Sequence, residues 1–482
     1  MTKITIRRFD RNVVQALTNR GFPEPLARAL AARHVTSPSD LDYEFKEMLS
    51  PWDLKNCREA GEAIADAIWK QKKIVIIGDY DCDGATAVSV GILGLQALGA
   101  FNVSYLIPDR DKDGYGLSPQ LVDRAAAAGA ELIITVDNGI SSVAAVEHAK
   151  TLGIEAVVTD HHLPGDEIPD TLVVNPNQRG DTFPSKSLAG VGVIFYVLIA
   201  VRSALRAKGA YPNGKQPNLQ HLIDLVALGT VADVVPLDRN NRILVSKGLD
   251  SIRAGKMQPG VSALLSVAGK NAHRISANDL GYILGPRINA AGRLDSINKG
   301  VECLTSYDYN TALFYAKELD QINAERRNRE VSMQSDAILS LQTISVDDSN
   351  SIVLKGDDWH AGIIGLVASR IKEQTYRPVI AFAPSEENGE HVLKGSGRSI
   401  PGIHLRDALD RVSKLSPGLI LKFGGHAMAA GLTIRKDAFD EFKELFARAV
   451  KELSDPEMFE RNIVTDGELR ASDFNIELVE AI

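Results

Sequence analysis

The sequence predicts an α/β fold in which a parallel-sheet domain is joined by a long helix to a smaller α/β domain. Short β-branched runs alternate with helical stretches from residue 74 onward, a pattern typical of βαβ units around a buried parallel sheet. A polar-rich segment with few Gly or Pro, roughly 308–342, predicts the connecting helix. Strands and helices alternate again after it, which indicates the second module.

Local periodicity predicts the individual elements. Residues 1–70 carry apolar positions at helical spacing and predict a helical lead-in. The expected strands of the first sheet cover 74–77, 103–107, 132–136, 154–158 and 171–174, with helices at 85–98, 119–128 and 141–152. The second module is expected to have strands near 352–355, 378–383 and 391–396, a helix at about 362–373, and glycine-rich turns at 395–397 and 424–425.

The composition describes a multi-domain protein without secretory or membrane signals. Its 482 residues, 44% hydrophobic and 24% charged, suffice for two or three packed domains. The N-terminus lacks the apolar stretch of a signal peptide, and no window reaches the roughly 18 uninterrupted apolar residues of a membrane span, so we expect a cytoplasmic protein. Three cysteines without C-x-x-C spacing argue against disulfides or zinc. With a net charge of −8, a polyanionic substrate would need a local basic groove and bound metal.

Acidic residues and histidines gather where apolar runs end, in the segments IVIIGDYDCDG, LIITVDNG, AVVTDHH and LGTVADVV. We interpret these runs as strands, although residues 187–230 as a whole have a helical pattern that leads up to Asp233. The side chains concerned are Asp79, Asp81, Asp83, Asp137, Asp160, His161, His162 and Asp233. Ligands of parallel sheets sit outside the carboxyl ends of the strands. Oxygen-rich clusters with a histidine hold Mg²⁺ or Mn²⁺ and activate water, so the pattern predicts a metal-dependent phosphate-cleaving site in which the histidine favours Mn²⁺.

Each cluster also has a purely structural interpretation. The first could be a solvated acidic turn that caps the next helix, Asp137 and Asp233 could be helix caps, and adjacent histidines in a loop are often incidental. The coincidence of the clusters favours the metal site. A calcium EF-hand is excluded because its twelfth position would be Val90, and a phosphate loop at 209–215 lacks the following Ser/Thr.

The motifs DYDCDG, TVDNG, TDHHLP and TVADVVPL together resemble the four motifs of the DHH phosphoesterase superfamily. Further blocks between about residues 40 and 435, among them IPDR, KSLAGVGV, GPRINAAGRL and LKGSGRS, resemble its single-strand-specific 5′-to-3′ DNA exonucleases. The resemblance implies two divalent metal ions, Mn²⁺ or Mg²⁺. The ligands that it implies are Asp81, Asp83, Asp137, His161 and Asp233, with Asp79 and His162 supporting the cluster or contacting phosphate.

The second module resembles the DHH-associated domain, which closes over the substrate. Its GGHAMAAG segment would meet nucleic-acid phosphate, although the same residues could form a helix-entry turn. Arginine and hydroxyl groups would bind the 5′ phosphate. The substrate-binding candidates are Arg110, Arg293, Ser396, Arg398, Gly424, Gly425 and His426.

The resemblance implies hydrolysis of single-stranded DNA from a 5′ end to 5′-mononucleotides in DNA repair and recombination, with a helicase and a single-strand-binding protein as partners. Two alternatives remain open within the fold. A sister enzyme would hydrolyse short oligonucleotides, cyclic dinucleotides or pyrophosphate, and a non-catalytic scaffold would only bind nucleic acid. Outside it, a metal-dependent phosphatase on an unrelated α/β fold is the other enzyme class.

The expected organisation has five segments. They are a helical lead-in (1–70), the DHH catalytic domain (71–305), the connecting helix (306–345), the DHH-associated substrate-binding domain (346–450) and a C-terminal segment (451–482). Such exonucleases typically continue into an oligonucleotide-binding barrel. We therefore expect the last segment to be the start of that module, truncated or reduced.

Overall fold

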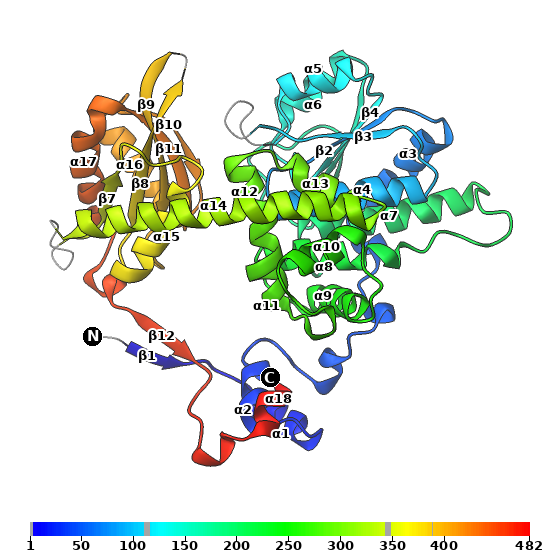
Figure 1. Cartoon of the computed structure of the whole chain (residues 1–482), viewed down its shortest axis with the longest axis horizontal. Helices are drawn as coiled ribbons and strands as arrows, with labels where there is room; N and C mark the ends of the chain where they lie inside the picture. The colour runs from blue at the N-terminus through cyan, green and yellow to red at the C-terminus, as the bar shows by residue number, and fades with distance from the viewer. Residues whose placement is uncertain (1–2, 110–115, 343–348, 388) are drawn as a thin grey trace. The chain divides into compact units, whose positions relative to one another are not determined.

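The computed structural model describes residues 3–109, 116–342, 349–387 and 389–482. The chain forms two compact units: residues 36–323 make one, and residues 1–35 together with 324–482 make the other. The predicted Arg110 lies outside the described residues. The ribbon in Figure 1 follows the chain through both units.

A five-stranded parallel sheet organises the 36–323 unit, with strand order β3-β2-β4-β5-β6. The strands are β2 (Ile74–Ile77), β3 (Val103–Leu106), β4 (Leu132–Val136), β5 (Glu155–Thr159) and β6 (Leu172–Val174). Ile77 pairs with Leu106 on one side and with Thr135 on the other, so these strands end at the same edge. The strands β2 and β4 are wholly buried, which explains their continuous β-branched sequences. The predicted α/β fold is confirmed.

Helices cover both faces of this sheet (Figure 1). One face packs on α5 (Pro119–Ala127) and α6 (Val143–Thr151). The other packs on α3 (Cys57–Trp69), α4 (Cys82–Ala97) and α7 (Gly190–Ala207). By length and composition α7 could cross a membrane, but 67% of its apolar window is buried in this core, as in the central helix of a globular domain.

Further helices complete the unit beyond the sheet. They are α8 (Ile223–Ala232), α9 (Arg239–Arg253), α10 (Pro259–Val267), α11 (Ala277–Asp279), a π-helical turn η6 (Leu280–Leu284), α12 (Gly285–Leu294) and α13 (Asn298–Thr305). The long helix α14 (Tyr309–Leu341) matches the predicted connection and belongs to this unit up to Asn323. Buried Arg287, which follows Pro286, is structural: it donates to the Ile283 carbonyl and forms an ion pair with Asp320.

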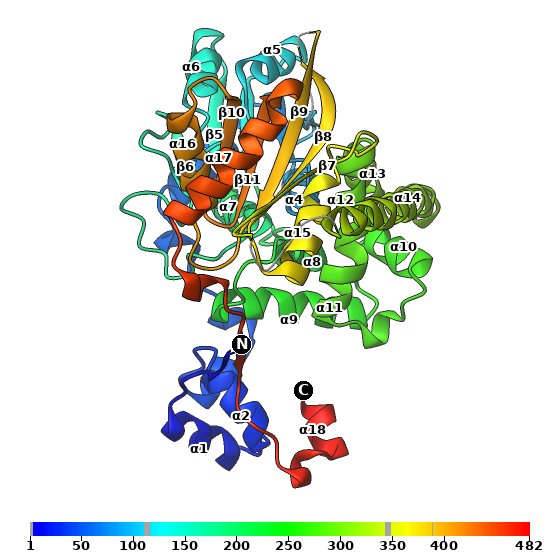
Figure 2. The ribbon, with the colours of Figure 1, turned by 90° about the vertical axis from the view of Figure 1, so that its left-hand side faces the viewer.

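The other unit contains a five-stranded mixed sheet of order β10-β11-β9-β8-β7. Its strands are β7 (Ile352–Lys355), β8 (Val379–Glu387), β9 (Glu390–Arg398), β10 (Ile420–Gly425) and β11 (Ala429–Arg435). The helices α16 (Leu405–Leu415) and α17 (Phe439–Glu452) pack on one face, as Figure 2 shows for α17, and α15 (Ile364–Thr375) contacts β8 and β9. Gly424 and Gly425 end β10 in the β10–β11 hairpin, so the alternative of a helix-entry turn is wrong.

The ends of the described chain meet in a small parallel sheet. Strand β1 (Lys3–Ile6) pairs with β12 (Asn462–Thr465), so residues 1–70 are not wholly helical as the sequence predicted. The helices α1 (Arg11–Asn19), α2 (Glu24–Ala31) and α18 (Ile476–Ala481) complete this region. Asp466 forms ion pairs with Arg7 and Arg33, which tie the first residues to the last segment.

Candidate metal centre

The first carboxylates lie between β2 and α4. Asp81 is the N-cap of α4 and accepts a backbone hydrogen bond of 2.9 Å within its own turn. Asp83 is buried and accepts hydrogen bonds from the first two residues of α7, from Gly190 N at 2.7 Å and from Val191 N at 3.0 Å. N–H groups in the first turn of a helix have no partner within the helix, so a carboxylate satisfies them well. Because Asp79 is also buried, the turn is not solvated, although it does cap the next helix as the structural interpretation expected.

Asp137 follows β4 in a left-handed backbone conformation, with φ of 61°. This conformation costs most residues about 1–2 kcal/mol, and aspartate tolerates it better than most. The turn is held by Asn138, whose side-chain amide donates to the carbonyls of Ile77 (3.1 Å) and Val136 (2.8 Å). A side chain at Gly190 would bring its Cβ within 2.6 Å of Asp137 Cβ and Oδ1, so α7 begins directly against this carboxylate.

The histidine pair follows β5 and is positioned by Asp160. One carboxylate oxygen of Asp160 accepts from His161 N (2.7 Å), His162 N (3.1 Å) and His162 Nδ1 (2.7 Å). The other accepts from Ile140 N at 2.9 Å. With both oxygens occupied by protein donors, Asp160 orients the two histidines.

Asp233 follows a helix, so the expectation that LGTVA forms a strand is wrong. The residue is the C-cap of α8, and its Oδ2 lies 3.6 Å from His161 Nε2. The same Nε2 lies 3.1 Å from Asp137 Oδ1. The helix approaches closely because Gly229 has no side chain: a Cβ there would lie 2.8 Å from Asp83 Oδ1. Asp233 thus reaches the sheet edge from an element outside the sheet.

The structure brings all seven predicted catalytic residues together. Ligand atoms within 4.8 Å of one another form three overlapping groups. The groups are Asp79, Asp81 and Asp137; Asp83, His161 and Asp233; and Asp137, His161 and His162. Two of the three groups share Asp137, and two share His161.

Burial and mutual repulsion disfavour negative charge on this cluster. Burial raises the pKa of Asp79, Asp83 and Asp137 well above the usual range, and the neighbouring aspartates add to the effect. The pKa of Asp233 is raised to about 6 by burial and by the charge of Asp81. Bound cations would stabilise the ionised form of these buried, mutually repelling carboxylates.

The two histidines are driven to opposite protonation states. Burial, with the charge of His162, lowers the pKa of His161 to about 4, so its imidazole is neutral at pH 7. Burial opposes a charge on His162 as well, but the hydrogen bond and charge of Asp160 prevail and raise its pKa to about 9. A neutral imidazole is a metal ligand, whereas a protonated one binds anions.

Two polar atoms support a cation site directly. Among the described residues, the buried Oδ1 of Asp79 and Nε2 of His161 have no hydrogen-bond partner. Buried polar atoms are rarely left unsatisfied unless a ligand, water or ion completes them. Carboxylate oxygens together with one neutral imidazole suit Mn²⁺. The carboxylate oxygens alone suit Mg²⁺. The residues present therefore fit divalent cations.

Three positioning residues were missed by the sequence reasoning. Asn289 of α12 accepts a hydrogen bond from Cys82 N at 2.8 Å and fixes the start of α4. Gly292 packs against the Tyr80 carbonyl with no room for a side chain. Gly190 contacts Asp137 as described above. These residues lie in the segments GPRINAAGRL and KSLAGVGV, but the sequence alone does not show their roles, because their contacts join distant parts of the chain.

The remaining substrate-binding candidates occupy their own elements. Arg293 lies at the end of α12 in the 36–323 unit. In the other unit, Ser396 and Arg398 lie on β9, where the Arg398 guanidinium donates to Ser396 Oγ at 3.2 Å. Both lie against Gly365 of α15. Gly424, Gly425 and His426 begin the β10–β11 turn.

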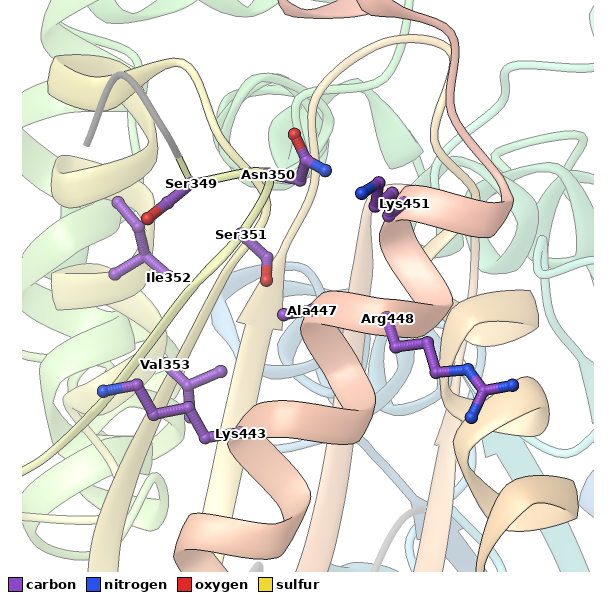
Figure 3. Close-up of a pocket in the computed structure, with 9 residues that line it drawn as sticks. All are labelled: Ser349, Asn350, Ser351, Ile352, Val353, Lys443, Ala447, Arg448 and Lys451. Carbon is purple, nitrogen blue, oxygen red and sulfur yellow. The ribbon is translucent and has the colours of Figure 1, made fainter. Parts of the chain in front are cut away.

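A pocket of about 400 Å³ lies between the start of β7 and α17 (Figure 3). Lys443 and Lys451 line it from one face of α17, with Ala447 between them, and Ser351 points towards it from the strand side. Of the predicted catalytic and substrate-binding residues that the structure describes, none lines this pocket.

The chain is similar to known proteins over nearly its whole length. Residues 73–230 match the DHH family, N-terminal domain, and residues 348–452 match the DHHA1 domain. The single-stranded-DNA-specific exonuclease RecJ of Salmonella typhimurium is 49% identical over 468 residues, which cover 96% of this chain and 80% of that protein.

Solved structures agree with the sequence comparison. The crystal structure of RecJ from Thermus thermophilus in complex with Mn²⁺ matches with a TM-score of 0.82 and 30% identity, over 100% of this chain and 67% of that one. Its complex with Mg²⁺ matches with a TM-score of 0.76 and 29% identity, over 100% and 65%. The chain therefore belongs to the DHH family and, within it, to the RecJ single-stranded-DNA-specific exonucleases.

Proposed function

We propose that this chain is a metal-dependent exonuclease that degrades single-stranded DNA from a 5′ end to 5′-mononucleotides. The observation that carries the proposal is the convergence of five aspartates and two histidines in three overlapping groups, each within 4.8 Å. The identity of 49% with a single-stranded-DNA-specific exonuclease supports the choice of substrate. This activity serves DNA repair and recombination.

We assign the metal ligands to the residues whose donor atoms converge. They are Asp81, Asp83, Asp137, His161 and Asp233, which would hold two divalent ions, Mn²⁺ or Mg²⁺. Asp137 is the bridging candidate because it belongs to the Asp79–Asp81 group and also lies 3.1 Å from His161. The chemistry that two bound cations supply is polarisation of the phosphodiester, activation of a water and neutralisation of the leaving oxygen.

The protein's own groups orient this chemistry. Burial keeps the imidazole of His161 neutral and so able to act as a ligand, and Asp160 holds the His161 backbone in place through its N–H. His162, which is protonated at pH 7, carries a positive charge near Asp79 that can contact a substrate phosphate. The first turn of α7 fixes both oxygens of Asp83. No side-chain nucleophile is required.

Recognition of the strand and its 5′ end is assigned to the phosphate-contact candidates. We propose that they bind the strand and its 5′ phosphate by charge-assisted hydrogen bonds and by backbone N–H groups at glycines. They are Arg110, Arg293, Ser396, Arg398, Gly424, Gly425 and His426. A helicase that unwinds duplex and a single-strand-binding protein are the proposed partners, since both act where single strands form. The proposed location is the cytoplasm.

The test is degradation of a single strand labelled at its 5′ or its 3′ end, with Mn²⁺ present. We expect early release of labelled mononucleotide from the 5′-labelled strand only, and no release from blunt duplex. The Asp137→Ala variant, checked for folding by circular dichroism, should release none. Hydrolysis of dinucleotides, cyclic dinucleotides or pyrophosphate without degradation of long strands would refute the proposal and favour a sister activity.

A further inference from the structure

The residue after Asp233 has an unusual backbone conformation. Val234 has φ of 64°, in the left-handed region that β-branched residues rarely adopt. Six non-glycine residues in the described part of the chain have positive φ, and Val234 is the only β-branched one among them. The others are His34, Asn56, Gln71, Asp137 and Tyr376.

The fold requires a left-handed backbone conformation at position 234, after α8, but it does not require a valine there. At the end of α8, Asp233 N donates to the Gly229 carbonyl at 2.9 Å and Val234 N to the Val231 carbonyl at 3.3 Å. Farther along, the buried amide of Asn241 holds the Pro236 carbonyl at 3.0 Å. The chain must therefore reverse between these fixed points. Glycine is the usual residue at such a helix end, because it has no Cβ to strain.

The valine side chain does not pack in the core, so no burial of apolar surface offsets this strain. Its side chain is exposed, with 84% of the residue accessible, whereas the next residue, Val235, packs against the main hydrophobic core. Strain that is retained at a functional site without a packing gain points to a role outside the fold. The position of Val234 shows where that role lies, since it adjoins a proposed metal ligand.

We propose that Val234 makes an apolar contact with the base of the nucleotide whose phosphate is held at the metal centre; this inference rests on the proposed function. Adjacent Cα atoms are about 3.8 Å apart, so Val234 lies one residue from the Asp233 ligand, and its exposed isopropyl group is open to a nucleotide bound there. Every base has an apolar face, so the contact is independent of sequence. This contact helps to hold the end of the strand that is being cleaved.

The experiment crosses protein variants with substrate variants. Parent and Val234→Gly enzymes are compared on a single strand and on the same strand with abasic residues at its two 5′-terminal positions. Loss of the bases should lower kcat/KM of the parent roughly three- to tenfold. The quantity compared is the ratio of kcat/KM on the intact strand to kcat/KM on the abasic strand. In Val234→Gly this ratio should fall towards one. The same is expected of Val234→Asn, because asparagine also tolerates the left-handed turn. Thermal unfolding should show both variants folded.

The matched control is Gln71→Gly. Gln71 has φ of 55° and lies just before β2, at the sheet edge opposite the carboxylates, so the substitution relieves similar strain away from the site. It should keep the parent ratio. A parent-like ratio in Val234→Gly overturns the base contact, and so does an altered Mn²⁺ affinity by calorimetry, which would indicate that Val234 instead positions Asp233. If the parent degrades neither strand, the proposed function itself fails.

Discussion

The start of α7 offers a sharp test of how the metal centre is held. Gly190 donates to Asp83 Oδ2 at 2.7 Å, and a Cβ placed on it would lie 2.6 Å from Asp137 Cβ. Carbon atoms in contact are about 3.5 Å or more apart. Gly190→Ala therefore requires α7 or the Asp137 turn to move by roughly 0.9 Å.

The expected cost follows from that displacement. If α7 retreats, its hydrogen bond to Asp83 lengthens to roughly 3.6 Å, beyond a normal bond, and that of Val191 weakens as well. Hydrogen bonds to charged groups contribute about 1.5–3 kcal/mol each, so losing the Gly190 bond costs about that much, and the weakened Val191 bond adds to it. Helix propensity alone favours alanine by about 1 kcal/mol. The steric argument thus predicts that Gly190→Ala lowers stability, whereas helix propensity alone predicts that it raises stability.

The assays are thermal unfolding and calorimetric titration with Mn²⁺. We expect Gly190→Ala to lower Tm and to weaken Mn²⁺ binding at least tenfold, with a loss of exonuclease activity on the order of a hundredfold, as small misplacements in active sites cause. Gly192→Ala is the control for the same helix turn, because its Cβ meets the Leu188 side chain and neither carboxylate. A Gly190→Ala variant with parental Tm and Mn²⁺ affinity would refute the reasoning.

Three further predictions concern buried carboxylates. Asp137→Ala should reduce cleavage below detection in a labelled-strand assay yet keep the circular dichroism spectrum; residual turnover would contradict its bridging role. Adding Mn²⁺ should raise Tm with concentration and EDTA should reverse it, because cations relieve the repulsion among the carboxylates; an unchanged Tm would argue against a metal centre. Burial raises the pKa of Asp224 to about 7, above its unfolded value, so the folded state holds the extra proton and stability should fall as pH rises from about 4 to 7. Asp224→Asn should flatten that slope in urea unfolding, and an unchanged slope would show that another group causes it.

Local patterns predicted the sheet and most of the candidate site. The run LIITV became β4 at the predicted residues, because a buried parallel strand is read directly from continuous β-branched residues. Strand ends then placed Asp79, Asp137 and His161 at one edge. That step needed no knowledge of tertiary contacts, since parallel neighbours end together.

Elements defined by distant contacts could not be predicted in this way. The run LGTVA became part of helix α8, since a short apolar run suits a buried helix or a strand equally. Gly190 shows its role only once α7 is packed against β4. The hydrogen bonds of Asp160 and the left-handed backbone of Val234 likewise become visible only in the folded turns. For Gly190 the deciding partner, Asp137, is remote in sequence.

The pairing of β1 with β12 affects how the chain can fold during its synthesis. Residues 36–323 form a contiguous unit that can fold once made, but β1 must wait until residue 462 has been translated (Figure 1). At about 5–20 residues per second this delay is roughly 20–90 s. During it the first strand, with Ile4 and Ile6, has an unpaired edge. Strand β1 is therefore one place where the nascent chain can pair with another chain before β12 is made, and a chaperone that covers β1 early should lower that risk.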